Sequence, residues 1–199
     1  MGRGTGHVES GFFGLFERRW AVPLLAELEA SGGGARLVTL AHRTGAGRAT
    51  ARQSIEHLVR LGVVAENPGH GHPLRPEFVL TPRGRRIAPP AAGLMRALTG
   101  LDAIEAGLRK WSMPTLGAIG DGARRFGEVT ERLGSATDRA ASIALRDLER
   151  LGLIERRIGN DRPPHPVYAA LDRAESCLAP LRAMRVQAAF GLHDVGSSS

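Results

Sequence analysis

Residues 48–64 read RATARQSIEHLVRLGVV, and residues 138–154 read DRAASIALRDLERLGLI. In the first stretch the apolar residues Ala51, Ile55 and Leu58 recur at helical spacing, and polar residues occupy the opposite face. Gly62 is typical of a helix end, and the two valines after it are typical of a strand. The stretch therefore predicts an amphipathic helix over residues 48–61 that leads into a strand.

The similarity between these two stretches is part of an internal repeat with an offset of about 90 residues. The matching pairs are Trp20 with Trp111, Pro23 with Pro114, Leu61-Gly62 with Leu151-Gly152, Leu80-Thr81 with Leu171-Asp172, and Ile87-Ala88-Pro89 with Leu178-Ala179-Pro180. Constant spacing over whole units predicts two domains, one over residues 11–99 and one over residues 100–192.

Each unit shows the same predicted order of elements: a helix, a Gly-rich break, a short helix, a second break and the longer helix described above. The first helices span residues 20–30 and 111–119, and the short ones span residues 37–42 and 126–133. Strands on either side of a turn rich in Gly, His and Pro (residues 68–76) predict a hairpin. Three helices followed by a hairpin predict a winged helix, so the fold class is mainly α with small β wings (α+β), and the two winged helix-turn-helix units form an intrachain pseudo-dimer.

A further helix closes each unit. In the first unit it begins after Thr81, with Pro82 at its first position. In the second, Asp172 followed by Glu175 predicts a capping box. Pro89 and Pro180 are expected to kink or restart these helices, because proline removes a helical hydrogen bond. The tail over residues 196–199 is expected to be disordered.

The charge of the chain favours an anionic partner. Lys and Arg number 27 against 20 Asp and Glu, a net charge of +7 at pH 7. Lys110 is the only lysine. The preference for Arg over Lys has two equally good explanations, phosphate binding and the codon usage of a GC-rich genome. Codon usage does not explain the net positive charge. Residues 1–99 carry 13 Arg and 7 Glu, whereas residues 100–199 carry 13 Arg and Lys110 against 13 acidic residues. The first half is therefore expected to contact nucleic acid more strongly.

Several blocks resemble the HxlR-type winged-helix regulators, relatives of the MarR group. In the second unit they are Lys110-Trp111-Ser112-Met113-Pro114-Thr115-Leu116, Arg125-Phe126-Gly127-Glu128-Val129 and Leu148 to Arg156, and in the first unit they are Glu77 to Gly84. The resemblance spans about residues 15–190 and implies a cytoplasmic DNA-binding regulator of the kind that works as a homodimer. This chain departs from that pattern because it has two units, lacks an N-terminal cysteine used for redox sensing, and places the aromatic of its second wing, Tyr168, one residue out of register.

A recognition helix reads base edges in the major groove through the exposed residues of its N-terminal part. In the first unit these candidates are Arg48, Ala49, Arg52 and Gln53, and Arg75 lies in the wing. The matching helix of the second unit offers Arg139, Ser142 and Arg146, and its wing offers Arg156, Arg157 and Arg162. Arginine suits guanine and glutamine suits adenine, whereas Asp138 at the start of the second helix would repel phosphate. The alternative interpretation of these residues is a solvated helix face.

Phe12, Phe13, Phe16 and Trp20 fall on one helical face ahead of the first unit. The leading interpretation is core packing between the two units, together with Leu94, Leu98, Leu101, Ile104, Val186 and Phe190. The alternative is a pocket for an aromatic small-molecule effector, shared with Trp111.

No catalytic residues, metal or cofactor are predicted. His70, His72 and His165 lack acidic or cysteine companions for a metal, Cys177 is the only cysteine, and no nucleophile elbow is present. No apolar run is long enough to span a membrane, and residues 1–11 lack the apolar core of a secretory signal, so we expect a cytoplasmic protein. The leading function is a sequence-specific regulator of transcription that binds double-stranded DNA as a monomeric pseudo-dimer or a homodimer. The alternatives are a drug-sequestering protein on the same scaffold and an adaptor in chromosome condensation, which the net positive charge disfavours.

Overall fold

The computed structural model of the chain describes residues 11–67, 77–159 and 164–190. The predicted turn over residues 68–76, with Arg75, lies outside these residues, as do Arg162 and the tail over residues 196–199. Phe190 ends the last helix, but its side chain is also outside the description.

After a helical turn over residues 11–14, the described residues of the first half form four further helices and a small sheet. In chain order they are α2 (Ala21–Ala30), β1 (Gly34–Arg36), α3 (Leu37–Thr44), α4 (Arg48–Arg60), β2 (Val64–Asn67), β3 (Glu77–Leu80) and α5 (Pro82–Gly100). The three strands pair antiparallel in the order β1-β3-β2. β1 was not predicted, because its three residues follow a run of glycines and show no alternation of apolar and polar side chains.

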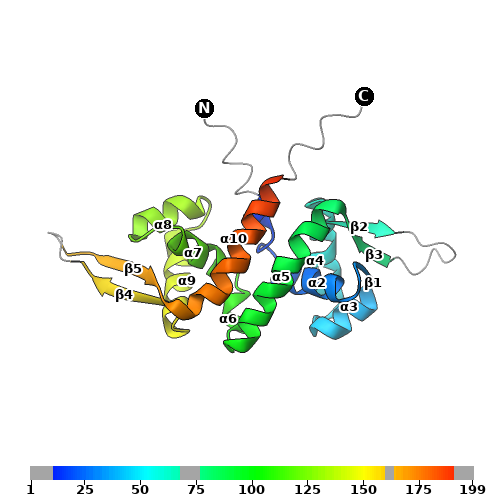
Figure 1. The fold of residues 1–199 in the computed structure, drawn as a ribbon, viewed down its shortest axis with the longest axis horizontal. Helices are drawn as coiled ribbons and strands as arrows, with labels where there is room; N and C mark the ends of the chain where they lie inside the picture. Colours follow the sequence, from blue (N-terminus) through cyan, green and yellow to red (C-terminus); the bar gives the residue numbers. More distant parts are fainter. Residues whose placement is uncertain (1–10, 68–76, 160–163, 191–199) are drawn as a thin grey trace, which may run out of the picture.

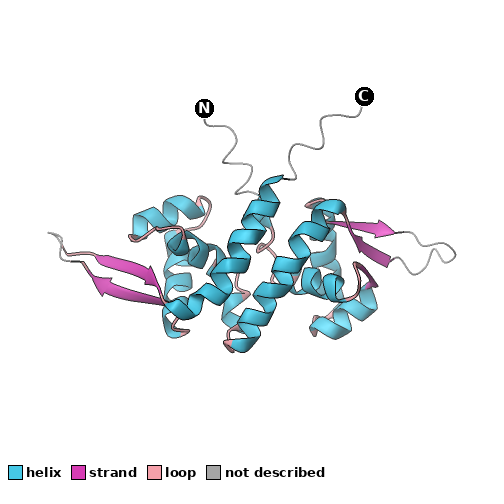
Figure 2. Ribbon diagram, viewed as in Figure 1, coloured by secondary structure: helices cyan, strands magenta, loops and turns pink. Residues whose placement is uncertain are grey.

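The second half repeats this order of elements, and the short helix α6 precedes them. Its elements are α6 (Ile104–Gly107), α7 (Ser112–Gly120), α8 (Phe126–Leu133), α9 (Asp138–Arg150), β4 (Ile154–Ile158), β5 (Pro166–Ala170), the 3-10 turn η1 (Asp172–Ala174) and α10 (Glu175–Phe190). A single antiparallel bridge from Arg125 to Val167 takes the place of the β1–β3 ladder. The predicted sequence of helices, hairpin and final helix is confirmed in both halves, and Figure 2 shows the two hairpins projecting at opposite ends of the molecule.

The hairpin registers correct the predicted offset for the ends of the two units. Glu66 pairs with Phe78 in the first hairpin, and Arg156 pairs with Tyr168 in the second. Both aromatic side chains are buried at strand positions 90 residues apart. The expectation that Tyr168 is one residue out of register was therefore wrong, as was the pairing of Leu80-Thr81 with Leu171-Asp172.

The same offset of 90 extends into the closing helices. The backbone N–H of Thr81 donates to Val63 O at 3.1 Å, and that of Leu171 donates to Leu153 O at 3.0 Å. Pro90 rather than Pro89 is thus the counterpart of Pro180. α5 and α10 continue through their prolines, so neither helix restarts there, and a kink at these positions stays a prediction. For Pro89 and Pro90 the residues four positions earlier are exposed, so water can satisfy the carbonyl groups that lose a partner.

The two closing helices begin differently. The Thr81 hydroxyl accepts a hydrogen bond from the Gly84 backbone N–H at 3.0 Å, which caps α5 as predicted for its start. The predicted capping box at Asp172 was wrong, because Asp172–Ala174 form a 3-10 turn and α10 begins only at Glu175. Gly84 explains the difference: a methyl group there would overlap the Val63 carbonyl oxygen, so only glycine lets the helix begin this close to the strand.

α5 and α10 lie side by side in the centre of the molecule and join the halves (Figure 1). They run antiparallel, since Arg83 at the start of α5 donates to Ala188 O at 3.1 Å near the end of α10, and Gly93 faces Pro180. Buried apolar side chains from both halves form one continuous cluster. Of the residues expected in this interface, Phe12, Phe16, Leu94 and Leu98 are buried, whereas Ile104 and Val186 are 38% and 51% exposed and correct that expectation.

Candidate nucleic-acid interface

Each half contains two helices joined by a tight turn, the arrangement of a helix-turn-helix. In the first half three residues connect α3 to α4, and Gly45 among them has the left-handed φ of 74° that ends α3. In the second half four residues connect α8 to α9. The Glu128 carboxylate accepts hydrogen bonds from the Arg124 and Arg125 backbone N–H groups at the start of α8, and these bonds hold the pKa of Glu128 below its usual range. The turns place α4 and α9 as the second helices of the two motifs.

The exposed face of α4 carries every helix residue predicted to read DNA in the first half. Arg48, Ala49, Arg52 and Gln53 are all exposed, while the apolar stripe containing Ala51 is buried. Arg52 contacts Glu56 at 3.5 Å, but both side chains are about half exposed, and such a surface pair is weak. The guanidinium groups of α4 are therefore accessible to a ligand in solution.

α9 presents a different set of side chains. Arg139 and Arg146 are exposed, Ser142 is half-buried, and Ile143 is 37% exposed. The Thr137 hydroxyl accepts a hydrogen bond from Ala140 N at 3.2 Å, so α9 has a side-chain cap that α4 lacks. Asp138 in the first turn favours the helix further through the helix dipole. Asp138, which stands where α4 has Arg48, is thus explained by its stabilising effect on the start of α9.

In the second half a hollow lies between the recognition-type helix α9 and the hairpin. This hollow, of about 340 Å³, is lined by Ser142, Leu145, Arg146, Glu149, Arg156 and Tyr168. It brings two predicted α9 residues next to Arg156 of β4, whereas Arg157 is exposed and pairs with Glu155 at 2.8 Å. Two arginines beside Ser142 form a basic edge, and Glu149 partly offsets their charge.

An ion pair with a buried carboxylate and exposed arginines supports α9 and was not predicted. Asp147 is only 6% exposed, and its carboxylate contacts Arg109 at 2.7 Å and Arg150 at 3.4 Å. The corresponding residue of α4 is His57, whose Nε2 lies 2.7 Å from Gly14 O. Both residues tie the helix to the segment that precedes the first helix of its half. Their residue types differ, so the repeat pattern gave no signal for them.

The aromatic residues predicted to share an effector pocket lie in different places. Phe12 and Phe16 are buried with ring centroids 5.2 Å apart, and Phe13 contacts Trp111 at 6.3 Å. Trp20 lines a groove against α5 and α6, whereas Trp111 lines a separate pocket beside α9. Trp20 and Trp111 thus line different pockets, and Phe12 and Phe16 lie in the core cluster that both halves share.

The described residues hold no cluster of His, Cys, Asp or Glu able to bind a metal ion. No helix among them is long and apolar enough to span a membrane. Cys177 is buried, and burial raises the pKa of its thiol, so the reactive thiolate is disfavoured.

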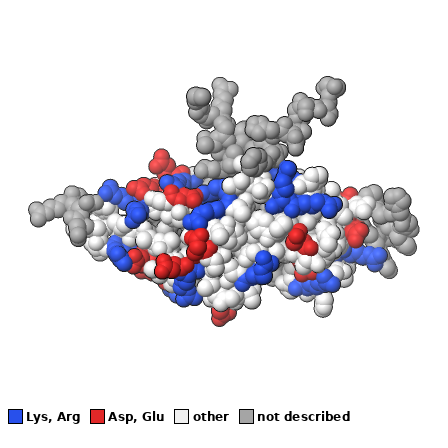
Figure 3. Space-filling view, viewed as in Figure 1, with Lys and Arg blue, Asp and Glu red and all other residues white. Residues whose placement is uncertain are grey.

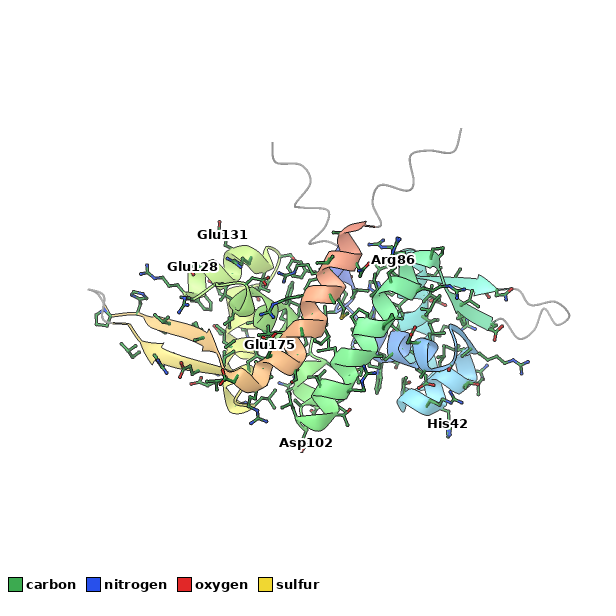
Figure 4. The ribbon with its side chains drawn as sticks, viewed as in Figure 1. His42, Arg86, Asp102, Glu128, Glu131 and Glu175 are labelled. Carbon is green, nitrogen blue, oxygen red and sulfur yellow. The ribbon has the colours of Figure 1, made fainter. Side chains whose placement is uncertain are left out.

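The face formed by α5 and α10 does not have the charge pattern of a DNA-binding surface. In Figure 3 basic and acidic side chains are interspersed over this face. Figure 4 labels Arg86 of α5 and Glu175 of α10 on it, and both residues are exposed. α4 and α9 lie to either side of this central pair in Figure 1.

Comparison with known proteins relates part of the chain to helix-turn-helix proteins. Residues 108–189 match the HxlR-like helix-turn-helix family. An uncharacterized HTH-type transcriptional regulator from Methanothermobacter thermautotrophicus is 33% identical over 75 residues, which are 38% of this chain and 57% of that protein. The chain thus spans little more than half the length of this relative. The reduced form of the transcriptional regulator YodB from B. subtilis aligns with 46% of this chain and 90% of its own, at 21% identity and a TM-score of 0.39. The Methanothermobacter relative is named as a regulator of transcription.

Proposed function

We propose that this protein is a sequence-specific DNA-binding regulator of transcription, built from two winged-helix units over residues 11–99 and 100–192. The observation that carries the proposal is the exposed row of Arg48, Arg52 and Gln53 on the second helix of a helix-turn-helix. The family match of residues 108–189 supports the same function for the second unit. The net charge of +7 suits a polyanionic partner.

In this proposal α4 enters the major groove with its N-terminal turns. Arg48 and Arg52 can each form two hydrogen bonds to the edge of a guanine, and Gln53 can form two to an adenine. Ala49 is small enough to lie against a thymine methyl group. Arg75 in the first wing and Arg157 and Arg162 in the second are then proposed to contact phosphate or the minor groove.

The two units act as the two halves of a dimer within one chain. The antiparallel packing of α5 on α10 supports this, because the two hairpins then point to opposite ends and α3 and α8 lie on opposite sides (Figure 1). A protein with this arrangement presents two recognition helices, α4 and α9, to two half-sites on the duplex. We propose a monomeric pseudo-dimer in which α9, through Arg139, Ser142 and Arg146, contributes less to the affinity for DNA than α4 does.

Fluorescence anisotropy with a labelled duplex from the region upstream of the gene tests the proposal. We expect log affinity to fall linearly with log salt between 50 and 200 mM, with a slope of about −0.9 for each phosphate contacted. An unrelated duplex of equal length is the control and should bind at least 100-fold more weakly than the specific site, on the order of the ratios such proteins reach. Absence of binding to either duplex at 50 mM salt would overturn the proposal.

A further inference from the structure

The segments that precede Trp20 and Trp111 occupy equivalent places on opposite halves. Arg19 lies over the Trp20 ring at 5.7 Å, and Lys110 lies over the Trp111 ring at 4.9 Å. Just after each tryptophan a backbone N–H bonds to the residue three positions earlier, Ala21 to Arg18 at 3.0 Å and Ser112 to Arg109 at 3.1 Å. With this offset of 91 residues, Phe12 corresponds to Ala103 and Phe13 corresponds to Ile104.

Beside Trp111, aromatic rings from the first-half segment occupy the available space. Phe13 lies edge-on to Trp111, with ring centroids 6.3 Å apart. Phe12 is fully buried, and the Arg185 guanidinium lies 4.8 Å from its ring centroid. The first-half segment thus packs on the tryptophan and the closing helix of the second half.

At the second place the corresponding residues are too small to do the same. Ala103 precedes α6 and Ile104 is its first residue. Ile104 lines the same groove as Trp20 of the first half, and α6 contacts α5. A groove of about 450 Å³ remains there, and the residues that matter for its chemistry are Trp20, Ala92, Met95, Arg96, Ile104 and Leu108. This volume lies within the range of small-molecule sites in proteins. Asp102, labelled in Figure 4, marks the turn where α5 leads into α6.

Of the charged side chains that line the groove, Glu27 and Arg43 pair with each other, and Arg96 is available to a ligand. Glu27 and Arg43 line one end and pair with each other at 2.8 Å. Arg96 is exposed at the groove, and among the described ranges no carboxylate lies within ion-pair distance of it. An apolar surface beside an uncompensated guanidinium suits a molecule with an aromatic ring and an anionic group, because arginine binds carboxylates with paired hydrogen bonds.

We propose that this groove binds a small aromatic carboxylate, whose ring packs on Trp20 as the Phe13 ring packs on Trp111 and whose carboxylate meets Arg96. The groove joins α2 and α5 of the first unit to α6, which leads into the second unit. A ligand there would therefore bias how the two recognition helices are placed relative to each other. This regulatory consequence rests on the proposed function, whereas binding of the ligand does not.

Isothermal titration calorimetry of the full chain without DNA tests the proposal, with 1-naphthoate as the probe. We expect a dissociation constant on the order of 10–100 µM, in line with what a ligand of this size can reach. The neutral analogue 1-naphthalenemethanol should bind at least 10-fold more weakly. Arg96→Gln should remove this preference for the anion.

Ile104→Phe is the decisive variant, because it supplies the ring that the groove lacks. It should weaken 1-naphthoate binding at least 10-fold while the melting temperature stays the same or rises. Val59→Phe is the matched control, since Val59 is 37% exposed and lies outside the groove, and it should bind like wild type. Ala92→Leu fills the groove from α5 and gives the same readout if Ile104→Phe does not fold.

Undiminished binding to a folded Ile104→Phe or Ala92→Leu protein would overturn the proposal, as would no binding of 1-naphthoate to wild type. Equal binding of the acid and the alcohol would overturn the role of Arg96. None of these results depends on DNA, so failure here is distinct from failure of the proposed function.

Discussion

Arg48→Ala and Arg52→Ala should each lower the affinity for the specific duplex by about 10- to 100-fold, whereas Arg139→Ala should lower it by less. A bidentate contact between arginine and guanine is worth about 1–3 kcal/mol of discrimination. Arg48 and Arg52 are exposed on α4, and Arg52 gives up only a weak surface pair with Glu56. Arg139 follows Asp138, and bringing that carboxylate close to phosphate offsets what Arg139 gains.

The comparison requires one duplex, one salt concentration and variants that keep the wild-type melting temperature. Arg86→Ala is the matched control, because it removes the same charge from an exposed position on the α5 face (Figure 4) and should change affinity little. An equal loss for Arg139→Ala and for the two α4 variants would show that the halves are equivalent readers. A palindromic site contacted alike by α4 and α9 would then replace the unequal pair proposed above.

Gly84→Ala should destabilise the protein by about 3 kcal/mol or more, because α5 begins against the first strand of its own hairpin. A methyl group at this position overlaps the Val63 carbonyl oxygen, which already accepts the Thr81 backbone N–H. Relief requires a backbone shift and loss of that hydrogen bond, whose costs are about 1–3 kcal/mol each. For a chain of this length, 1 kcal/mol corresponds to about 2–4 °C in melting temperature.

Gly93→Ala supplies the matched control in the same helix. A Cβ there would lie 3.6 Å from Pro180 Cβ, an ordinary contact, and alanine favours a helix by about 1 kcal/mol over glycine. Thermal unfolding followed by circular dichroism should therefore show a lower melting temperature for Gly84→Ala and an equal or higher one for Gly93→Ala. Equal melting temperatures for the two variants would contradict the assigned contact between α5 and the hairpin.

The sequence predicted the helices because their signals are local. α8 was placed at residues 126–133, and the structure has the same bounds, since an apolar-periodic stretch there ends at Gly134. α4 and its exposed arginines followed from one clear amphipathic stripe. The predicted correspondence between the two closing helices was wrong by one residue. It matched Leu80 to Leu171 without regard to which backbone groups pair across the hairpin. Only the ladder from Thr81 to Val63 and from Leu171 to Leu153 fixes that register.

The features that sequence did not predict depend on contacts between distant segments. The groove beside Trp20 is lined by residues of α2, α3, α5 and α6 that lie far apart in the sequence, and none of them indicates a groove by itself. The same holds for Asp147, which looks like an ordinary surface acid until Arg109 is brought against it from α6 and α7. A pocket shared by Trp20 and Trp111 was the alternative interpretation of the aromatic residues, whereas in the structure the two side chains line different pockets.

The central claim is that one chain supplies both recognition helices, and the number of chains bound to one specific duplex tests it most directly. Native mass spectrometry of the complex with a duplex that holds a single footprint-length site is the measurement. We expect one protein chain per duplex at saturation, with α4 and α9 of that chain on adjacent stretches of the groove. Two chains per duplex, bound together with no detectable single-chain complex, would contradict the claim and would assign the two-fold arrangement to a dimer of chains.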